Sequence, residues 1–101
     1  MVKINNYAKE SGKRANQLYY EWTVYIDEPS GVLDHIEEVE YTLHATFPEP
    51  RQIRNNRDDK FALSTAGWGE FTILVAIKFD DGEVETMPYW LDLNKRYPND
   101  N

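Results

Sequence analysis

Hydrophobic and polar residues alternate along three stretches of the chain, residues 21–26 (EWTVYI), 36–44 (IEEVEYTLH) and 70–79 (EFTILVAIKF). In the first stretch Trp22 and Val24 share one side, and the residue between them points the other way. Successive side chains of a strand point to opposite faces, so a period of two indicates strands that are buried on one face. The three stretches therefore predict half-buried strands in a chain that is nearly all β.

Turn-forming residues separate these strands. Asp81-Gly82 supplies the positive φ that a two-residue hairpin requires, and it predicts antiparallel pairing of residues 70–80 with residues 83–93. Residues 47–59 (FPEPRQIRNNRDD) predict a long polar loop. Together with an N-terminal edge strand, the pattern predicts strands at residues 2–9, 18–27, 35–44, 60–64, 70–80 and 83–93.

Short strands joined by turn-rich loops are typical of two antiparallel sheets packed face to face. The predicted fold class is therefore all-β, an immunoglobulin-like antiparallel β-sandwich. A chain of 101 residues favours a single domain, here 1–101. The chain has no cysteine, so the sandwich lacks an inter-sheet disulfide.

Charge and hydropathy limit the partners. The net charge of −7 opposes binding to a phosphate backbone, which requires an excess of Lys and Arg. The one basic cluster, at residues 51–60, is interrupted by Asp58 and Asp59, and we interpret it as a solvated loop. No stretch resembles a signal peptide or approaches the roughly 20 apolar residues of a membrane span. We expect no nucleic-acid or membrane partner and a cytoplasmic location, or a nuclear one if the source is eukaryotic.

Residues suited to catalysis are few. His35 and His44 are the only imidazoles, and neither GxSxG nor HExxH occurs. Glu37, Glu38 and Glu40 with His35 offer metal-ligand chemistry. Glu38 and Glu40 share a face, but nothing fixes a third ligand, so we interpret the carboxylates as solvated. The sequence predicts a non-catalytic protein without a metal or cofactor. A hydrolase that uses His44 as its base is the remote alternative.

A binding site requires fewer specific residues than a catalytic site. Residues 43–50 (LHATFPEP) end a strand, and residues 67–69 (GWG) begin a loop in which glycine permits unusual φ and close approach of a ligand. If the two loops meet, Phe47 and Trp68 form the walls of a slot with Thr46 at its floor. Taken singly, each aromatic residue could instead cap the core.

The segments LHATF and GWGEF resemble the two signature motifs of the YEATS domain family, a His-x-(Ser/Thr)-Phe/Tyr loop followed by a Gly-(Trp/Tyr)-x-x-Phe loop. The likeness extends over most of the chain, because EWTVYI and GWGEFTILVAIKF are similar to family strands. This resemblance implies an immunoglobulin-like sandwich and, by analogy with eukaryotic members, a reader of acylated lysine. The short length looks more like the prokaryotic YEATS-like domains.

The resemblance also implies a role for each matching residue. Phe47 and Trp68 would enclose the acyl chain, and the Thr46 hydroxyl and the Trp68 backbone N–H would bond the amide. Leu18 falls where some members carry a further aromatic residue, which implies a weaker outer wall. The ligand-binding residues implied are His44, Thr46, Phe47, Gly67, Trp68, Gly69 and Phe71.

We therefore predict a non-catalytic reader of an acylated lysine, on a peptide or other modified protein, or of a related amide-bearing ligand. A flat crotonyl group would fit two aromatic walls better than acetyl. The alternative is a protein-interaction module that binds an unmodified peptide or pairs through a sheet edge, with Trp68 as a loop anchor. The sequence leaves the acyl group, the peptide and the oligomeric state open.

Overall fold

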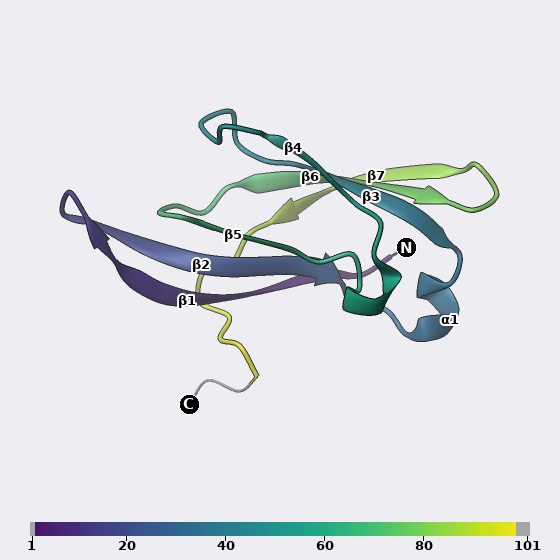
Figure 1. Cartoon of the computed structure of the whole chain (residues 1–101), viewed down its shortest axis with the longest axis horizontal. Coiled ribbons are helices and arrows are strands. Elements are labelled where there is room, and N and C mark those ends of the chain that lie inside the picture. Colours follow the sequence, from purple (N-terminus) through teal and green to yellow (C-terminus); the bar gives the residue numbers. More distant parts are fainter. Residues whose placement is uncertain (1, 99–101) are drawn as a thin grey trace.

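Two antiparallel sheets pack face to face in a computed structural model of the protein, which describes residues 2–98 (Figure 1). One sheet has three strands in the order β1-β2-β5, and the other has four in the order β4-β3-β6-β7. The elements are β1 (Ile4–Arg14), β2 (Gln17–Ile26), helix α1 (Ser30–Leu33), β3 (Ile36–Thr42), β4 (Arg51–Arg54), the 3-10 helix η1 (Arg57–Asp59), β5 (Leu63–Gly67), β6 (Thr72–Phe79) and β7 (Val84–Trp90). The predicted sandwich is confirmed.

The core follows the predicted alternation. Trp22 and Val24 of β2 and Val75 and Ile77 of β6 are fully buried and belong to one hydrophobic core cluster. Tyr41 of β3 is also buried, and its hydroxyl donates to the Phe61 carbonyl at 2.7 Å. Burial raises the pKa of Tyr41, so this hydroxyl stays protonated at neutral pH. Alternating strands thus supply one continuous hydrophobic layer.

The hairpin of β6 and β7 is confirmed, but its turn differs from the predicted two-residue type. Gly82 has a φ of 89°, whereas Asp81 is not left-handed. The Gly82 N–H donates to the Phe79 carbonyl at 3.0 Å, and the Phe79 N–H donates to Glu83 at 2.9 Å. The Asp81 carboxylate accepts the Glu83 N–H at 2.9 Å. This side-chain bond holds a longer loop in which glycine alone takes the left-handed conformation.

The predicted loop over residues 47–59 contains an edge strand, so that prediction was wrong in part. β4 pairs antiparallel with β3, and Leu43 extends the ladder by donating to the Pro50 carbonyl at 2.7 Å. Arg51 donates twice to the Glu40 carboxylate, at 2.7 and 3.2 Å. An edge strand this polar is held by backbone pairing and cross-strand charge, and it therefore lacks the hydrophobic period that identifies buried strands.

The N-terminal strand is longer than predicted. β1 continues to Arg14 and turns at Ala15 and Asn16, both of which have positive φ, 51° and 66°. These values suit the two-residue turn of a hairpin, although Ala is an unusual residue there. β1 and β2 then pair along their whole length, and the hairpin projects beyond the sandwich at the left of Figure 1. The projecting hairpin brings Arg14 and Tyr19 to that end of the molecule.

One buried polar residue joins the C-terminal segment to the sheet. Asn6 is fully buried, and its Oδ1 accepts from the Tyr89 hydroxyl at 2.5 Å and the Asp92 N–H at 3.2 Å. Its Nδ2 donates to the Asp92 carbonyl at 2.8 Å. Further along, the Ala8 N–H donates to the Lys95 carbonyl at 2.6 Å. Asn6 therefore holds the end of β7 and the following segment against β1.

Candidate functional site

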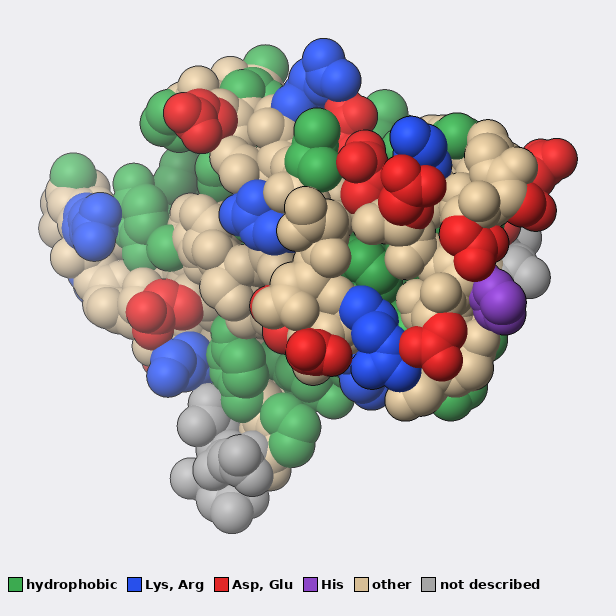
Figure 2. Space-filling model, turned by 45° about the vertical axis from the view of Figure 1, so that its right-hand side comes forward, with side chains coloured by type: hydrophobic (Ala, Val, Ile, Leu, Met, Phe, Trp, Pro, Cys, Tyr) green, Lys and Arg blue, Asp and Glu red, His purple; other side chains and the backbone are tan. Residues whose placement is uncertain are grey.

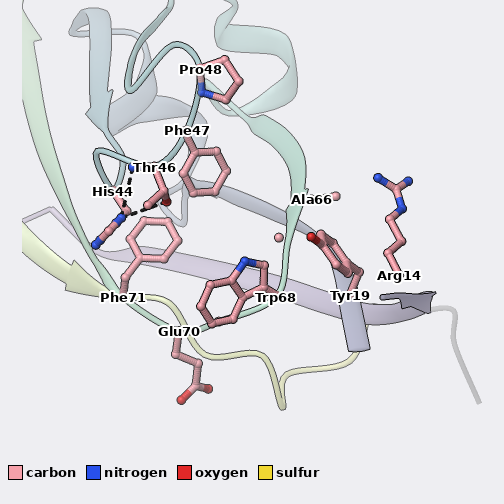
Figure 3. A pocket seen from close by; sticks show the side chains of 12 residues that line it. Arg14, Tyr19, His44, Thr46, Phe47, Pro48, Ala66, Trp68, Glu70 and Phe71 are labelled. Carbon is pink, nitrogen blue, oxygen red and sulfur yellow. Dashed lines mark hydrogen bonds between the residues drawn. The ribbon is translucent and has the colours of Figure 1, made fainter. Parts of the chain in front are cut away.

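Three loops meet at the same end of the sandwich, at the left of Figure 1: the β3–β4 loop, the β5–β6 loop and the tip of the β1–β2 hairpin. They enclose a pocket of about 580 Å³, and Figure 3 shows its side chains. The seven residues predicted for the site all line it: His44, Thr46, Phe47, Gly67, Trp68, Gly69 and Phe71. The pocket is also lined by Arg14, Tyr19, Pro48, Ala66 and Glu70, which sequence reasoning did not select.

The inner wall is built from rings anchored in the core. Phe47 and Phe71 have centroids 5.5 Å apart, and both contact Trp22 edge to face, at 6.3 and 6.0 Å. Trp22 is fully buried, so these two rings rest on the hydrophobic layer beneath the pocket. Phe47, which was expected either to form a wall of the slot or to cap the core, does both: it lines the pocket and packs against the core.

The outer wall is Trp68, whose side chain is 57% exposed. Within residues 2–98 its ring stacks on no other ring, in contrast to Phe47 and Phe71. Figure 3 shows Trp68 and Phe47 on different sides of the pocket, with Phe71 and Tyr19 completing the ring of aromatic side chains. Trp68 is therefore free to contact a ligand without giving up a core contact.

The flanking glycines act differently from the prediction. Neither Gly67 nor Gly69 has a positive φ, so the expected unusual backbone conformation is absent at both. A Cβ on Gly67 would lie 3.4 Å from Cζ of Phe47, at the limit of comfortable packing, whereas one on Gly69 would meet nothing. Gly67 therefore lets the Phe47 ring approach β5 closely, and Gly69 leaves open space beside the pocket.

His44 and Thr46 form a hydrogen-bonded pair at the pocket (Figure 3). Nδ1 of His44 accepts the Thr46 backbone N–H at 3.2 Å and lies 2.9 Å from Thr46 Oγ1. Because Nδ1 accepts an N–H, this network assigns the ring proton to Nε2, and the Thr46 hydroxyl then donates to Nδ1. Its oxygen lone pairs remain available to accept a hydrogen bond from a ligand.

Catalytic and metal chemistry find little support in the described part of the chain. His44 has no carboxylate partner that would orient it as a base, and residues 2–98 hold no group of three potential metal ligands. Two of the carboxylates considered as metal ligands pair with cations: Glu40 with Arg51 at 2.6 Å and Glu37 with Lys78 at 3.7 Å. His35 lies 3.2 Å from Asp80. The Glu40–Arg51 and Glu37–Lys78 contacts are surface ion pairs.

The distribution of charged side chains on the surface agrees with the acidic net charge of the sequence. On the face shown in Figure 2, acidic and basic side chains are interspersed and form no continuous basic patch. The absence of nucleic-acid binding stays a prediction. Among residues 2–98, no helix has the length and apolar character required to cross a membrane.

These features define an immunoglobulin-like sandwich with an aromatic pocket between the loops at one end. A family model described as the prokaryotic YEATS domain matches residues 20–92, which is more than half of the chain. The protein belongs to the YEATS domain family, as the resemblance of its two motifs predicted. The matched residues include both motif loops.

Curated relatives share this region. The Protein AF-9 homolog of Kluyveromyces lactis is 37% identical over 68 residues, which cover 65% of this chain and 30% of the relative. Transcription initiation factor TFIID subunit 14b of Arabidopsis thaliana is 28% identical over 104 residues, which cover 98% of this chain and 37% of that protein. The chain thus spans about a third of the length of these relatives.

Solved structures show the same fold. The Yaf9 YEATS domain recognising an H3K122suc peptide superposes with a TM-score of 0.73 at 24% identity, covering 93% of this chain and 78% of the other. The Yaf9 YEATS domain bound to H3K27ac superposes with a TM-score of 0.70 at 23% identity, covering 93% and 76%. At these identities the likeness establishes the architecture of the sandwich.

Proposed function

We propose that this protein is a non-catalytic reader that binds an acylated lysine of a peptide or modified protein in the aromatic pocket. The observation that carries the proposal is the assembly of both motif loops around one cavity, with two anchored rings, one free-standing ring and a hydroxyl acceptor. Family membership supports it, since Yaf9 domains recognise succinylated and acetylated H3 peptides. The net charge of −7 favours approach of a basic, lysine-rich peptide.

In the proposed complex the acyl chain lies between Phe47 and Trp68. The Thr46 Oγ1 accepts the ligand amide N–H, because its own proton is directed to His44. The backbone N–H of Trp68, just after the end of β5, donates to the acyl carbonyl. An amide buried between rings needs both partners, since an unpaired polar group costs about 1–3 kcal/mol.

Acyl preference tests the proposal. We expect crotonyl-lysine peptides to bind about three- to tenfold more tightly than acetyl-lysine peptides, because a flat conjugated group covers both rings and offset stacking adds about 0.5–1.5 kcal/mol. Unmodified lysine should bind weakest, since its ammonium loses hydration between the rings. Isothermal calorimetry with three peptides of one sequence measures the order. Equal affinity for all three would reject the reader function and favour an interaction module for unmodified peptides.

The Thr46 hydroxyl has its own test. Thr46→Val keeps the shape of the side chain but removes the acceptor, and we expect acetyl- or crotonyl-lysine affinity to fall by roughly 1–3 kcal/mol. Thr46→Ser keeps the hydroxyl and should bind within about twofold of the wild type. Calorimetry on the three proteins makes the comparison. Wild-type affinity in Thr46→Val would mean that the hydroxyl serves His44 alone.

A further inference from the structure

Arg14 is the one Lys or Arg among the side chains that line the pocket in the described structure. It lies at the end of β1, beside the hairpin turn, and its guanidinium carbon is 5.2 Å from the centroid of the Tyr19 ring. Within residues 2–98 no carboxylate lies within ion-pair distance of Arg14. By contrast, Arg51 pairs with Glu40 and Arg57 with Asp34, each at 2.6 Å. Other Lys and Arg residues of the described chain also lack an ion pair, so Arg14 is distinguished by its place at the pocket and over the Tyr19 ring.

Stacking on Tyr19 prepares Arg14 to bind an anion. A guanidinium that lies over an aromatic face keeps its N–H edge free, and that edge matches the two oxygens of a carboxylate. The ring also restricts the long side chain, which reduces the entropy that binding would otherwise cost. The chemistry favoured at this position is therefore a carboxylate bound through paired N–H···O bonds.

The position of Arg14 suggests which carboxylate it meets. In Figure 3, Tyr19 and Arg14 lie on the side of Trp68 away from Thr46 and Phe71. All of these residues line the same cavity, and its volume of about 580 Å³ leaves room beyond a short acyl group. A lysine amide held at Thr46 would extend its acyl chain past Trp68 toward the guanidinium. The far end of the chain would then be the part that approaches Arg14.

The acidic residue of the pocket does not oppose an anion there. Glu70 accepts the Leu93 N–H at 2.9 Å, and this bond holds one oxygen of its carboxylate at the C-terminal segment. Figure 3 shows its carboxylate pointing away from the ring of aromatic side chains at the bottom of the view, while Arg14 lies at the right, beyond Tyr19. The pocket thus carries opposite charges on two sides, with the positive charge next to the Tyr19 wall.

We propose that Arg14, stacked on Tyr19, binds the terminal carboxylate of an acidic acyl chain, so that the pocket selects dicarboxylic acyl-lysines over neutral acyl-lysines of equal length. This selectivity rests on the proposed reader function and assigns Arg14 as its specificity-determining residue. Succinyl and butyryl groups form the matched pair, because both have four carbons and differ in the terminal carboxylate. A neutral chain would contact the same rings but leave Arg14 solvated.

The test uses single blocked amino acids, so that no flanking residue contributes. Nα-acetyl-Nε-succinyl-lysine methylamide and its butyryl analogue are titrated by calorimetry into the wild type, Arg14→Gln and Lys13→Gln. We expect Arg14→Gln to weaken the succinyl ligand about tenfold, equivalent to about 1.4 kcal/mol, and to change the butyryl ligand less than twofold. Lys13→Gln removes the same charge from the neighbouring exposed position, which does not line the pocket, and should change neither. The succinyl preference should also weaken as salt rises.

The outcomes separate the two proposals. Butyryl binding with no effect of Arg14→Gln on the succinyl ligand would overturn the assignment of Arg14 and leave the reader function standing. Equal losses for both ligands would show that Arg14 shapes the pocket without reading charge, which also overturns it. Failure of the wild type to bind either ligand would reject the reader function itself. The carboxylate that Arg14 binds could also come from a side chain next to the acylated lysine, and a second series of butyryl-lysine peptides with an acidic neighbouring residue tests this source. If Arg14→Gln weakened these peptides but not the succinyl ligand, Arg14 would read the flanking sequence, and the acyl-chain proposal would be overturned.

Discussion

Trp68→Ala is expected to lower acyl-lysine affinity by about 2–3 kcal/mol, roughly 30- to 150-fold, with little change in melting temperature. The ring forms the outer wall of the pocket, so its loss exposes the acyl chain to water on one side. Because Trp68 is 57% exposed and rests on no other ring of the described chain, the truncation leaves no cavity in the core. Calorimetry with a crotonyl-lysine peptide and a thermal melt followed by circular dichroism measure the two effects.

Trp90→Ala is the matched control, because Trp90 is 56% exposed on β7 and does not line the pocket. It should leave affinity and stability near wild type. Phe47→Ala should behave differently from both, losing binding and also stability, since Phe47 packs edge to face on Trp22. If Trp68→Ala instead melted as early as the core variant Val75→Ala, the ring would belong to the core and the pocket would lack its outer wall.

Asn6→Ala is expected to destabilise the protein by about 3–5 kcal/mol, which is a large share of the stability of a small domain. The substitution removes three hydrogen bonds and leaves the Tyr89 hydroxyl and both backbone groups of Asp92 without their partner, each at a cost of about 1–3 kcal/mol where burial excludes water. Burial, with a smaller effect of Asp92, raises the pKa of Tyr89 to about 12, so this hydroxyl is a donor throughout the neutral range. Urea unfolding followed by circular dichroism measures the loss.

Asn55→Ala serves as the control for Asn6→Ala, because Asn55 is exposed between β4 and η1 and its substitution should change the unfolding free energy by less than about 0.5 kcal/mol. Equal stability of the two variants would show that the C-terminal segment does not depend on Asn6. The comparison also bears on the pocket, since the Leu93 N–H in the same segment fixes Glu70.

Local sequence determined the strands that carry a hydrophobic alternation. β2, β3 and β6 could be predicted because burial on one face of a strand requires a period of two, which one strand displays without its neighbours. β4 could not be predicted in this way, since its pairing with β3 depends on backbone groups and on the Arg51–Glu40 contact rather than on buried side chains. The extension of β1 to Arg14 escaped prediction for the same reason.

The residues of the candidate site likewise fall into those that the sequence could predict and those that it could not. Its seven predicted residues lie in two short motifs, and motif resemblance can identify such residues without a structure. Arg14 and Tyr19 belong to no motif, and the expected outer position, Leu18, pairs with Lys13 and does not line the pocket. A register shift between Glu10 and Gly12 alters the pairing of the hairpin, and its effect on the side chains near the tip depends on both strands together.

Alternation and two motifs in the sequence therefore determined the sandwich, the inward faces of its central strands and the residues of the two loops. Tertiary structure alone decided that the loops meet, that Phe47 rests on Trp22 while Trp68 stands free, and that Arg14 joins them. It also decided the burial of Asn6, whose bonding partners lie 83 and 86 residues away along the chain. Strand burial repeats at fixed intervals and is visible locally, whereas contacts between distant segments arise only when the two sheets close on a common core.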